Sequence, residues 1–261
     1  MHSKEGDIPI NQNLFELASR QVNPISPFLH VFKDCRQEGE LILFKNEPLF
    51  TEDKHFQRTL HVLEGTARMQ ICHQEYEVKK GHIVVVPSKT QVTFSDMEKS
   101  FLTFSLASLE PDSEHPKDSS IVVANLFDLY NSTESKPFMS TSDANGERHS
   151  SSKVAEIPVF SPEMAEEGYA LGHSQAARLL IYEEAITLDR HTHPKAQHAI
   201  TVLSGHGTVE FEGKKFDLTA GGLFVVPPKT RHQLGSYGDF LAFVVNTPGI
   251  PSTHPHYSQP A

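Results

Sequence analysis

The sequence predicts an all-β protein built from two tandem barrels. Residues 61–90 recur as residues 201–230, with Gly65 matched by Gly205 140 residues later, so one module occurs twice. Within each copy, short runs of β-branched and aromatic residues are separated by Gly and Pro turn signals. Many short strands without convincing amphipathic helices are typical of antiparallel sandwiches and barrels.

The first copy contains four runs with strand character. Turn signals separate them at Glu64-Gly65, Lys80-Gly81 and Pro87-Ser88. The expected strands are Leu60–Val62, Ala67–Ile71, Ile83–Val86 and Phe101–Leu106.

The second copy has the same succession of runs. Glu212-Gly213-Lys214 between two of them is expected to be a tight hairpin turn. The expected strands are Arg178–Leu188, His198–Leu203, Gly207–Phe211, Gly222–Val226 and Phe240–Val245.

A short lead-in precedes each copy. Asn13–Leu17 resembles Asn125–Leu129, and each segment is expected to be either a short helical turn or an edge strand. The polar segment Ser132–Lys153 accounts for the extra length of the second module and is expected to be an irregular loop. We therefore expect an N-terminal barrel over residues 1–112 and a C-terminal barrel over residues 113–261.

Composition excludes several classes of protein. The 261 residues carry a formal net charge of −10 and no block rich in Lys or Arg, so no electrostatic route to nucleic acid or an anionic membrane is evident. No apolar run approaches a membrane span, and the polar start lacks the apolar stretch of a signal peptide, so we expect a cytoplasmic protein. With only Cys35 and Cys72, a disulfide framework is not expected and a zinc site built from cysteines is excluded.

Four histidines in the second copy have the spacing of metal ligands. His191 and His193 lie two residues apart, which places both imidazoles on one face of a strand. His198 shares the inward face of the next strand, and His232 follows a third turn. Imidazoles from three strands can converge on one transition-metal ion, and neutral imidazole suits zinc, copper, iron and nickel.

These residues resemble the cupin family. Its first motif is His-x-His, four residues, Glu, six residues and Gly; its second is Gly, five residues, Pro-x-Gly, two residues and His. The resemblance covers residues 178–246 and, through the repeat, 41–107. The residues in register are His191, His193, Gly205, Gly221, Pro227 and His232.

The resemblance implies two double-stranded β-helix (jelly-roll) barrels and one divalent transition metal: Fe, Zn, Ni, Mn or Cu. Two residues depart from the family pattern: His198 stands at the glutamate position and Lys229 at a glycine position. His198 is either a fourth ligand or a hydrogen-bonding neighbour of a three-histidine site, and Gln197 should point the other way. Four imidazoles competing with protons should make metal retention depend on pH near pH 6.

The first copy lacks these ligands. The equivalent residues are Thr51, Asp53, Arg58 and Val92, so a metal-free N-terminal barrel is expected. His61 corresponds to Thr201, on the outward face, and is expected to be a surface histidine.

The sequence specifies the function of the protein less closely than its fold. By resemblance, the chain is either a metal-dependent dioxygenase or isomerase acting on a small, anionic organic molecule, or a non-catalytic binding, sensor or storage protein. A homodimer is expected on the same ground. Lys195, Lys229 and Arg231 flank the ligand-bearing turns, either as solvated charges or as a cationic rim. Candidates for a general base are chosen only because they lie on expected barrel strands; they are Glu183, Glu210 and Tyr182.

Overall fold

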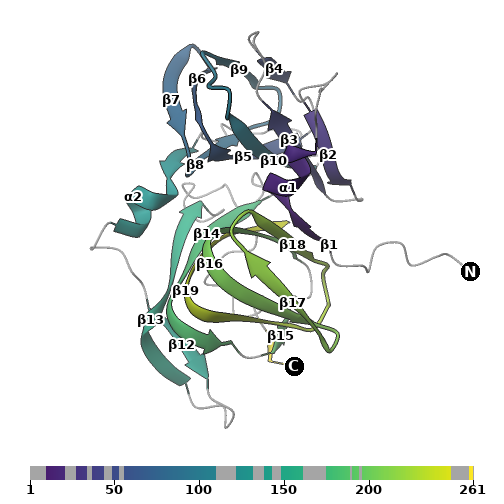
Figure 1. Ribbon diagram of the computed structural model, residues 1–261, viewed down its shortest axis with the longest axis vertical. Helices are drawn as coiled ribbons and strands as arrows, with labels where there is room; N and C mark the ends of the chain where they lie inside the picture. The colour runs from purple at the N-terminus through teal and green to yellow at the C-terminus, as the bar shows by residue number, and fades with distance from the viewer. Residues whose placement is uncertain are drawn as a thin grey trace, which may run out of the picture. The chain divides into compact units, whose positions relative to one another are not determined.

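The structure, a computed structural model, describes residues 10–20, 28–33, 37–43, 49–52, 56–109, 122–131, 138–142, 148–160, 175–188, 190–193, 196–247 and 259–260. It divides into two compact units (Figure 1). The N-terminal unit consists chiefly of Leu14–Asp128. The C-terminal unit combines Met1–Asn13 with Leu129–Met164 and Gln175–Ala261.

The N-terminal unit is a two-sheet barrel. One sheet has the strand order β11-β8-β5-β10-β3-β2 and the other β4-β9-β6-β7. Alternate residues of β5, β6, β8 and β9 face a core that includes Leu60, Met69 and Phe94. The elements are α1 (Leu14–Ser19), β2 (Phe28–Lys33), β3 (Gln37–Leu43), β4 (Leu49–Glu52), β5 (Phe56–Glu64), β6 (Thr66–Ile71), β7 (Gln74–Lys79), β8 (His82–Val86), β9 (Gln91–Ser95), β10 (Leu102–Leu109) and β11 (Val122–Asn125), after which α2 (Leu126–Asn131) follows.

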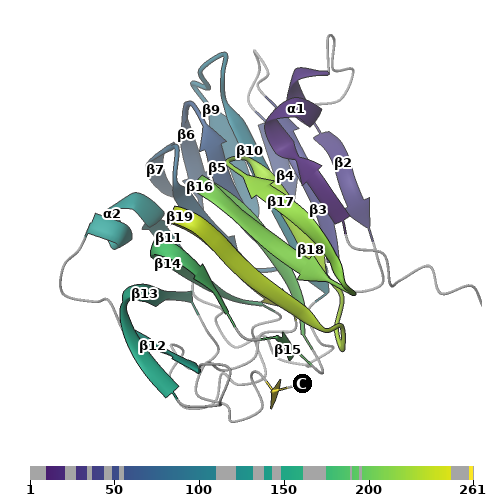
Figure 2. The same ribbon diagram turned by 60° about the horizontal axis from the view of Figure 1, so that its bottom comes forward.

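The C-terminal unit has the same strand order but is built from longer strands. Its main path is β1-β18-β16-β19-β14-β13-β12, with β17 paired to β16 and β15 paired to β19 (Figure 2). Strand β16 corresponds to β5 and β6 of the N-terminal unit, and β19 corresponds to β9 and β10. The strands are β1 (Ile10–Asn13), β12 (Phe138–Ser142), β13 (Arg148–Phe160), β14 (Ala176–Thr187), β15 (His191–Thr192), β16 (Gln197–Phe211), β17 (Lys214–Thr219), β18 (Gly222–Val226), β19 (His232–Thr247) and β20 (Gln259–Pro260).

Both units are therefore jelly-roll barrels, and the predicted all-β architecture of two barrels is confirmed. Neither helix of the described residues is long and apolar enough to span a membrane. The expected hairpin at Glu212-Gly213 is present, with φ values of 48° and 77°. Positive φ at both central residues suits the twist of a two-residue hairpin.

The two lead-in segments are exchanged between the barrels. Strand β1 pairs with β18 in the C-terminal unit, whereas β11 pairs with β8 in the N-terminal unit. Asn125 accepts a hydrogen bond from the backbone N–H of Phe127 at 2.9 Å, so it caps the helical turn that follows its strand. Each lead-in thus contains both alternatives expected from the sequence, an edge strand and then a helical turn.

The expected boundary between residues 112 and 113 lies outside the described residues, and the division at that point stays a prediction. The two compact units divide the chain after Asn13 and within α2. A strand needs only a neighbouring edge with free N–H and C=O groups, and the edge may belong to the other module. Sequence repeats identify modules, but they do not identify which edge a lead-in joins.

Two expectations about local structure are wrong. The segment Ser132–Lys153, expected to be an irregular loop, contains β12 and the start of β13. Backbone pairing of β12 with β13 overrides the low strand propensity of its Ser residues. The runs His198–Leu203 and Gly207–Phe211 belong to one strand, β16, with register shifts near Gly205.

His61 is also placed differently from the expectation, because it is buried and not a surface residue. It lies on β5 opposite Phe104, on the face turned away from the barrel core, and the equivalent Thr201 is buried too. Burial lowers the pKa of His61 to about 3, because a charged imidazolium loses its hydration there. The outward face is therefore buried at these two equivalent positions of β5 and β16.

The first prediction concerns the turn at Gly205. An added Cβ at Gly205 (φ +83°) would overlap the Asp239 carbonyl oxygen and lie 2.9 Å from the Phe240 Cα, whereas one at Gly213 (φ +77°) meets nothing within 4 Å. Both replacements by alanine carry the left-handed strain of about 1 kcal/mol, but only Gly205→Ala must also displace backbone, at about 2 kcal/mol or more in addition. Urea denaturation of the two variants measures the difference, and equal free energies of unfolding would contradict the packing described.

The second prediction concerns acid stability. The pKa of His61 lies below its unfolded value of 6.5, so the unfolded state binds the extra proton as the pH falls below 6.5. Between pH 6.5 and about 3, wild type should therefore lose up to about 1.4 kcal/mol of stability per pH unit through this residue. His61→Thr, which introduces the residue of the equivalent position, should show a shallower pH dependence in urea denaturation between pH 7.5 and 5. Parallel curves for the two proteins would refute the assignment.

Candidate metal centre

Strand pairing brings together the four histidines identified from the sequence. His191 in β15 lies directly opposite His232, the first residue of β19. His193 follows β15, and His198 near the start of β16 lies opposite Val226 and Asn246. His193, His198 and His232 are buried, while His191 is half-buried. Alternation along the strand predicts that His198 points inward. This orientation is confirmed, because His198 lies on the same face of β16 as the core residues Ile200 and Val202.

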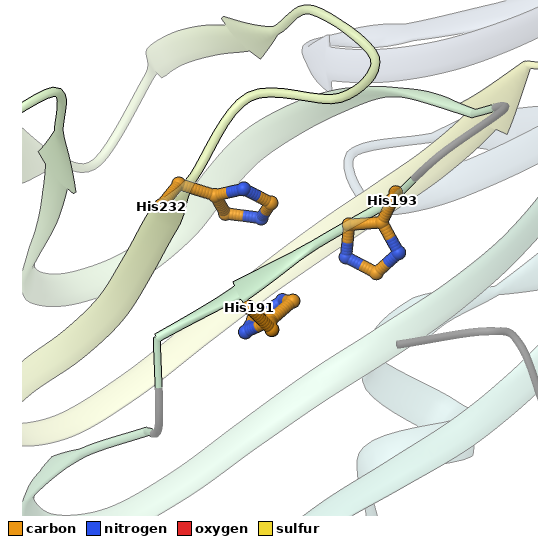
Figure 3. A group of neighbouring side chains, drawn as sticks. All are labelled: His191, His193 and His232. Atoms are coloured by element: carbon orange, nitrogen blue, oxygen red, sulfur yellow. The ribbon is translucent and has the colours of Figure 1, made fainter. Parts of the chain in front are cut away.

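Three of the imidazoles form a compact group. One ring nitrogen each of His191, His193 and His232 lies within 4.8 Å of the others (Figure 3). Their ring centroids are 4.8 Å apart for His191 and His193, 4.5 Å for His191 and His232, and 5.2 Å for His193 and His232. Ligand nitrogens about 2.0–2.1 Å from a common ion are separated by roughly 3–4 Å, so small side-chain rotations bring these three into range.

His198 lies beside this group and not within it. Its ring centroid is 3.7 Å from that of His193 and 5.7 Å from that of His232. Its Nε2 atom is buried and makes no hydrogen bond to the described residues. A buried imidazole nitrogen without a hydrogen bond is costly in an apolar barrel, and an ion bound at this nitrogen would remove the cost.

Burial keeps His193, His198 and His232 uncharged. Desolvation, followed by the charges of His191, His232 and Arg178, lowers the pKa of His193 to about 2. Desolvation and His191 lower the pKa of His232 to about 4, and the same kinds of cause place that of His198 well below 6.5. The proton competition expected near pH 6 therefore moves to lower pH, because these side chains are already deprotonated there.

Backbone contacts orient two of the histidines. His232 Nδ1 lies 3.0 Å from the Thr230 carbonyl oxygen, and donation of its proton to that oxygen leaves Nε2 as the lone-pair donor. The backbone N–H of Lys229 donates to the His193 carbonyl oxygen at 2.8 Å. Lys229, at a position where the motif has glycine, adopts a φ of 61°. The lysine thus takes the left-handed conformation that glycine adopts without cost, and the turn is preserved.

The N-terminal barrel has different residues at the equivalent places. Thr51 lies opposite Val92, as His191 lies opposite His232, and Asp53 lies outside the described residues. Arg58, at the His198 position, forms an ion pair with Glu40 at 3.1 Å.

A second group of potential ligand atoms is found in the N-terminal barrel, in His30, Glu38 and Glu40. Both of its carboxylates already have cationic partners: Lys33 lies 2.8 Å from Glu38, and Arg58 pairs with Glu40. Two cationic side chains of the protein offset the two carboxylates, which argues against a divalent ion here. The group is better explained as an ion-pair network.

The general-base candidates are placed apart from the histidines or away from the interior. Glu183 is exposed, and Glu210 forms an ion pair with Arg190. Tyr182 lies in the apolar core beside Phe240.

Sequence reasoning missed Arg178, whose charge acts on His193 and His198. The sequence did contain a signal for this residue. Arg178 lies on the inward face of an expected strand together with Leu180 and Tyr182, where a charged residue is uncommon.

The donor set fits a transition metal. Neutral imidazoles in a closely spaced, mostly buried group are the ligands that such ions prefer. His191, His193 and His232 can hold the ion, and the orphaned nitrogen of His198 lies beside them.

Comparison with known proteins identifies the class of this fold. Residues 179–246 match the family model for the cupin domain, so the C-terminal barrel is a cupin domain. The chain as a whole is a cupin-fold protein with two barrels, the N-terminal one cupin-like. No match was found among curated protein sequences.

Solved structures share this fold along nearly the whole chain. A cupin 2 conserved barrel domain protein from Leptotrichia buccalis is 15% identical, with a TM-score of 0.60 over 95% of this chain and 99% of that one. Salicylate 1,2-dioxygenase from Pseudaminobacter salicylatoxidans is 12% identical, with a TM-score of 0.66 over 95% and 86% of the two chains. Protein Ylba from E. coli is 14% identical, with a TM-score of 0.65 over 94% and 93%. One variant of the salicylate dioxygenase has been solved in complex with gentisate.

The third prediction tests His198. If it is a ligand, His198→Ala should weaken metal binding about tenfold or more, because loss of a ligand or its supporting contact typically costs at least that. His198→Glu, which introduces the residue of the family motif, should retain the metal. Chelator competition followed by elemental analysis at pH 7 and pH 5 measures both.

Gln197→Ala is the matched control, since this neighbouring residue on the same strand points away from the histidines. Metal affinity of His198→Ala equal to that of wild type at both pH values would exclude His198 as a ligand. The site would then be one of three histidines.

Proposed function

We propose that this protein is a metal-dependent enzyme that acts on a small anionic organic molecule in its C-terminal barrel, as a dioxygenase-like oxidoreductase or an isomerase. The observation that carries the proposal is the convergence of His191, His193 and His232 within 4.8 Å. We further propose that His198 is the fourth ligand.

The burial pattern of the histidines supports access from one side. His191 is half-buried, whereas His193, His198 and His232 are 3%, 5% and 4% exposed. A ligand can therefore approach past His191, while the other three side chains exclude water behind it. A bound metal would supply Lewis acidity and a site for water or an oxygen donor of the substrate.

The charge of the ligand set favours an anionic substrate. All four histidines are neutral donors, and the usual carboxylate of the motif is replaced by His198. An ion held by neutral ligands keeps its full positive charge, which stabilises an anion beside it. The proposal is supported by salicylate 1,2-dioxygenase, which has the same fold at 12% identity.

A non-catalytic binding or storage role is the second candidate. It is favoured by the burial of three of the four histidines, since a closed cage suits retention of an ion more than turnover. In either case we propose a homodimer acting in the cytoplasm. Size-exclusion chromatography with light scattering tests the dimer.

The fourth prediction distinguishes these roles. Wild type should contain about one transition-metal ion per chain, and His193→Ala should lose most of it, because the three-ligand group would be broken. The iron(II)-loaded protein should consume O₂ with at least one member of a panel of salicylate, gentisate, diketones, flavonols and thiols. Oxygen electrode measurements and elemental analysis check the two parts.

His206→Ala removes an exposed histidine of β16 and serves as the control. If His193→Ala keeps the metal content of wild type, the proposed metal site is wrong. Tight metal binding without turnover of any panel member, including isomerisation followed by NMR, would favour the binding role.

A further inference from the structure

The strand that carries His191 has little backbone pairing. β15 consists of two residues and meets β19 at one register position, His191 opposite His232, while its other edge pairs with the two-residue strand β20. In the N-terminal barrel, the equivalent strand β4 pairs with β9 over four positions, which include Thr51 opposite Val92. The backbone ladder to the neighbouring long strand therefore fixes β15 less firmly than it fixes β4.

Side chains supplement the backbone pairing beside β15. The backbone N–H of Leu188 donates to the Leu234 carbonyl oxygen at 2.9 Å, and the Gln233 amide donates to the Leu188 carbonyl oxygen at 2.6 Å. Arg190 Nε donates to the side-chain oxygen of Gln233 at 3.4 Å, and the Arg190 guanidinium forms an ion pair with Glu210. We call Arg190, Gln233 and Glu210 the outer clamp.

The outer clamp lies on the face of the sheet that is turned away from the histidines. Phe211 and His232 form a register pair on the inward face, so the neighbouring Gln233 points outward. Gln233 directly follows His232 in the chain, and Arg190 directly precedes His191. The contact between Arg190 and Gln233 therefore joins the two chain segments that carry these two histidines.

The N-terminal barrel has no such clamp at the equivalent place. The residues there are Phe50, Gln70 and Thr93, and Thr93 lies opposite both Phe50 and Gln70. No ion pair can form among these three uncharged side chains. The outer clamp thus occurs in the barrel that carries the histidine group, and the barrel without the histidines has a longer backbone ladder instead.

We propose that Gln233, through the outer clamp, is a positioning residue that holds His191 beside His232 at the spacing a metal ion requires. The proposal rests on the proposed function and adds to it the residues that position a ligand. The ring centroids of His191 and His232 are 4.5 Å apart (Figure 3). Residues that orient metal ligands without touching the ion typically contribute about 10–100-fold in metal affinity.

The outer clamp should affect the metal site more than the stability of the fold. The side chains of Arg190 and Glu210 are 47% and 28% exposed, and an ion pair in contact with water adds little to the free energy of unfolding. A change in the position of β15, by contrast, moves the imidazole of His191 relative to that of His232. Metal affinity is therefore the measurement that distinguishes a positioning role from a purely structural one.

The test replaces Gln233 by threonine, the residue at the equivalent place in the N-terminal barrel. Gln233→Thr removes the contacts with Leu188 and Arg190, so zinc affinity should fall about tenfold or more. Glu210→Gln keeps an acceptor for Arg190 without the charge, and its zinc affinity should lie between those of Gln233→Thr and wild type. Competition with a fluorescent chelator at pH 7 measures the affinities, and urea denaturation of the metal-free proteins should give nearly equal midpoints.

Thr93→Ala is the matched control, because Thr93 is half-buried at the same place in the other barrel. This variant should bind zinc as wild type does. In a His191→Ala background, Gln233→Thr should have no further effect on zinc affinity, because the ligand that Gln233 positions is gone. Wild-type zinc affinity in Gln233→Thr, or the same loss of affinity with and without His191, overturns the proposal.

Hydrogen exchange in the metal-free proteins separates this inference from the proposed function. Mass spectrometry of a peptide that contains residues 188–193 should show about tenfold faster exchange in Gln233→Thr than in wild type or Thr93→Ala. A protein that takes up no metal overturns the proposed function, while exchange in this peptide still decides whether the outer clamp holds the segment that carries His191. Unchanged exchange in Gln233→Thr, in a protein that binds metal, overturns this inference alone.

Discussion

The pairing of β16 with β19 is the constraint on which the C-terminal barrel depends. These two strands remain in register from Gln197 opposite Thr247 to Phe211 opposite His232, with shifts near Gly205. Because they run through both layers of the barrel, their inward residues form the core and also carry His198 and His232. The left-handed backbone at Gly205 permits the close approach of the two strands at the shift, where a side chain would meet the backbone of Asp239 and Phe240. The positions of His198 and His232 are thus a property of strand pairing and not of a loop.

The two barrels resolve the same problem, polar groups in a closed interior, in different ways. The N-terminal barrel pairs Arg58 with Glu40, so that each charge is offset by the other. The C-terminal barrel uses imidazoles, which burial holds in the neutral form, and retains one guanidinium at Arg178. A neutral donor group is costly when buried without a partner, and His198 Nε2 is such a group among the described residues. The interior of the C-terminal barrel therefore offers neutral nitrogen ligands to a metal ion, whereas the equivalent place in the N-terminal barrel holds an ion pair.

Exchange of the lead-in strands gives each barrel one edge strand from the other repeat. β1 covers the edge of β18, and β11 covers the edge of β8. Covering these edges satisfies backbone groups that would otherwise be exposed at the end of a sheet. The helical turn that follows β11 is held by the turn between β7 and β8: the backbone N–H of Leu126 donates to the Gly81 carbonyl oxygen at 2.9 Å, and Phe127 packs against Gly81.

The sequence by itself determined the all-β class, the two copies of one module, the turns and the inward face of the histidines. These follow from local features, since strand alternation has a period of two and turn residues act on their own backbone. Tertiary structure alone decided what depends on distant partners: which edge each lead-in joins, the burial of His61, the strands within Ser132–Lys153, and the displacement of His198 from the three-histidine group. It also decided the neighbourhood of Arg190. The contacts of its guanidinium with Gln233 and Glu210 appear only when β16 and β19 are paired, because hydrogen bonds and charge pairs of this kind arise between strands far apart in the chain.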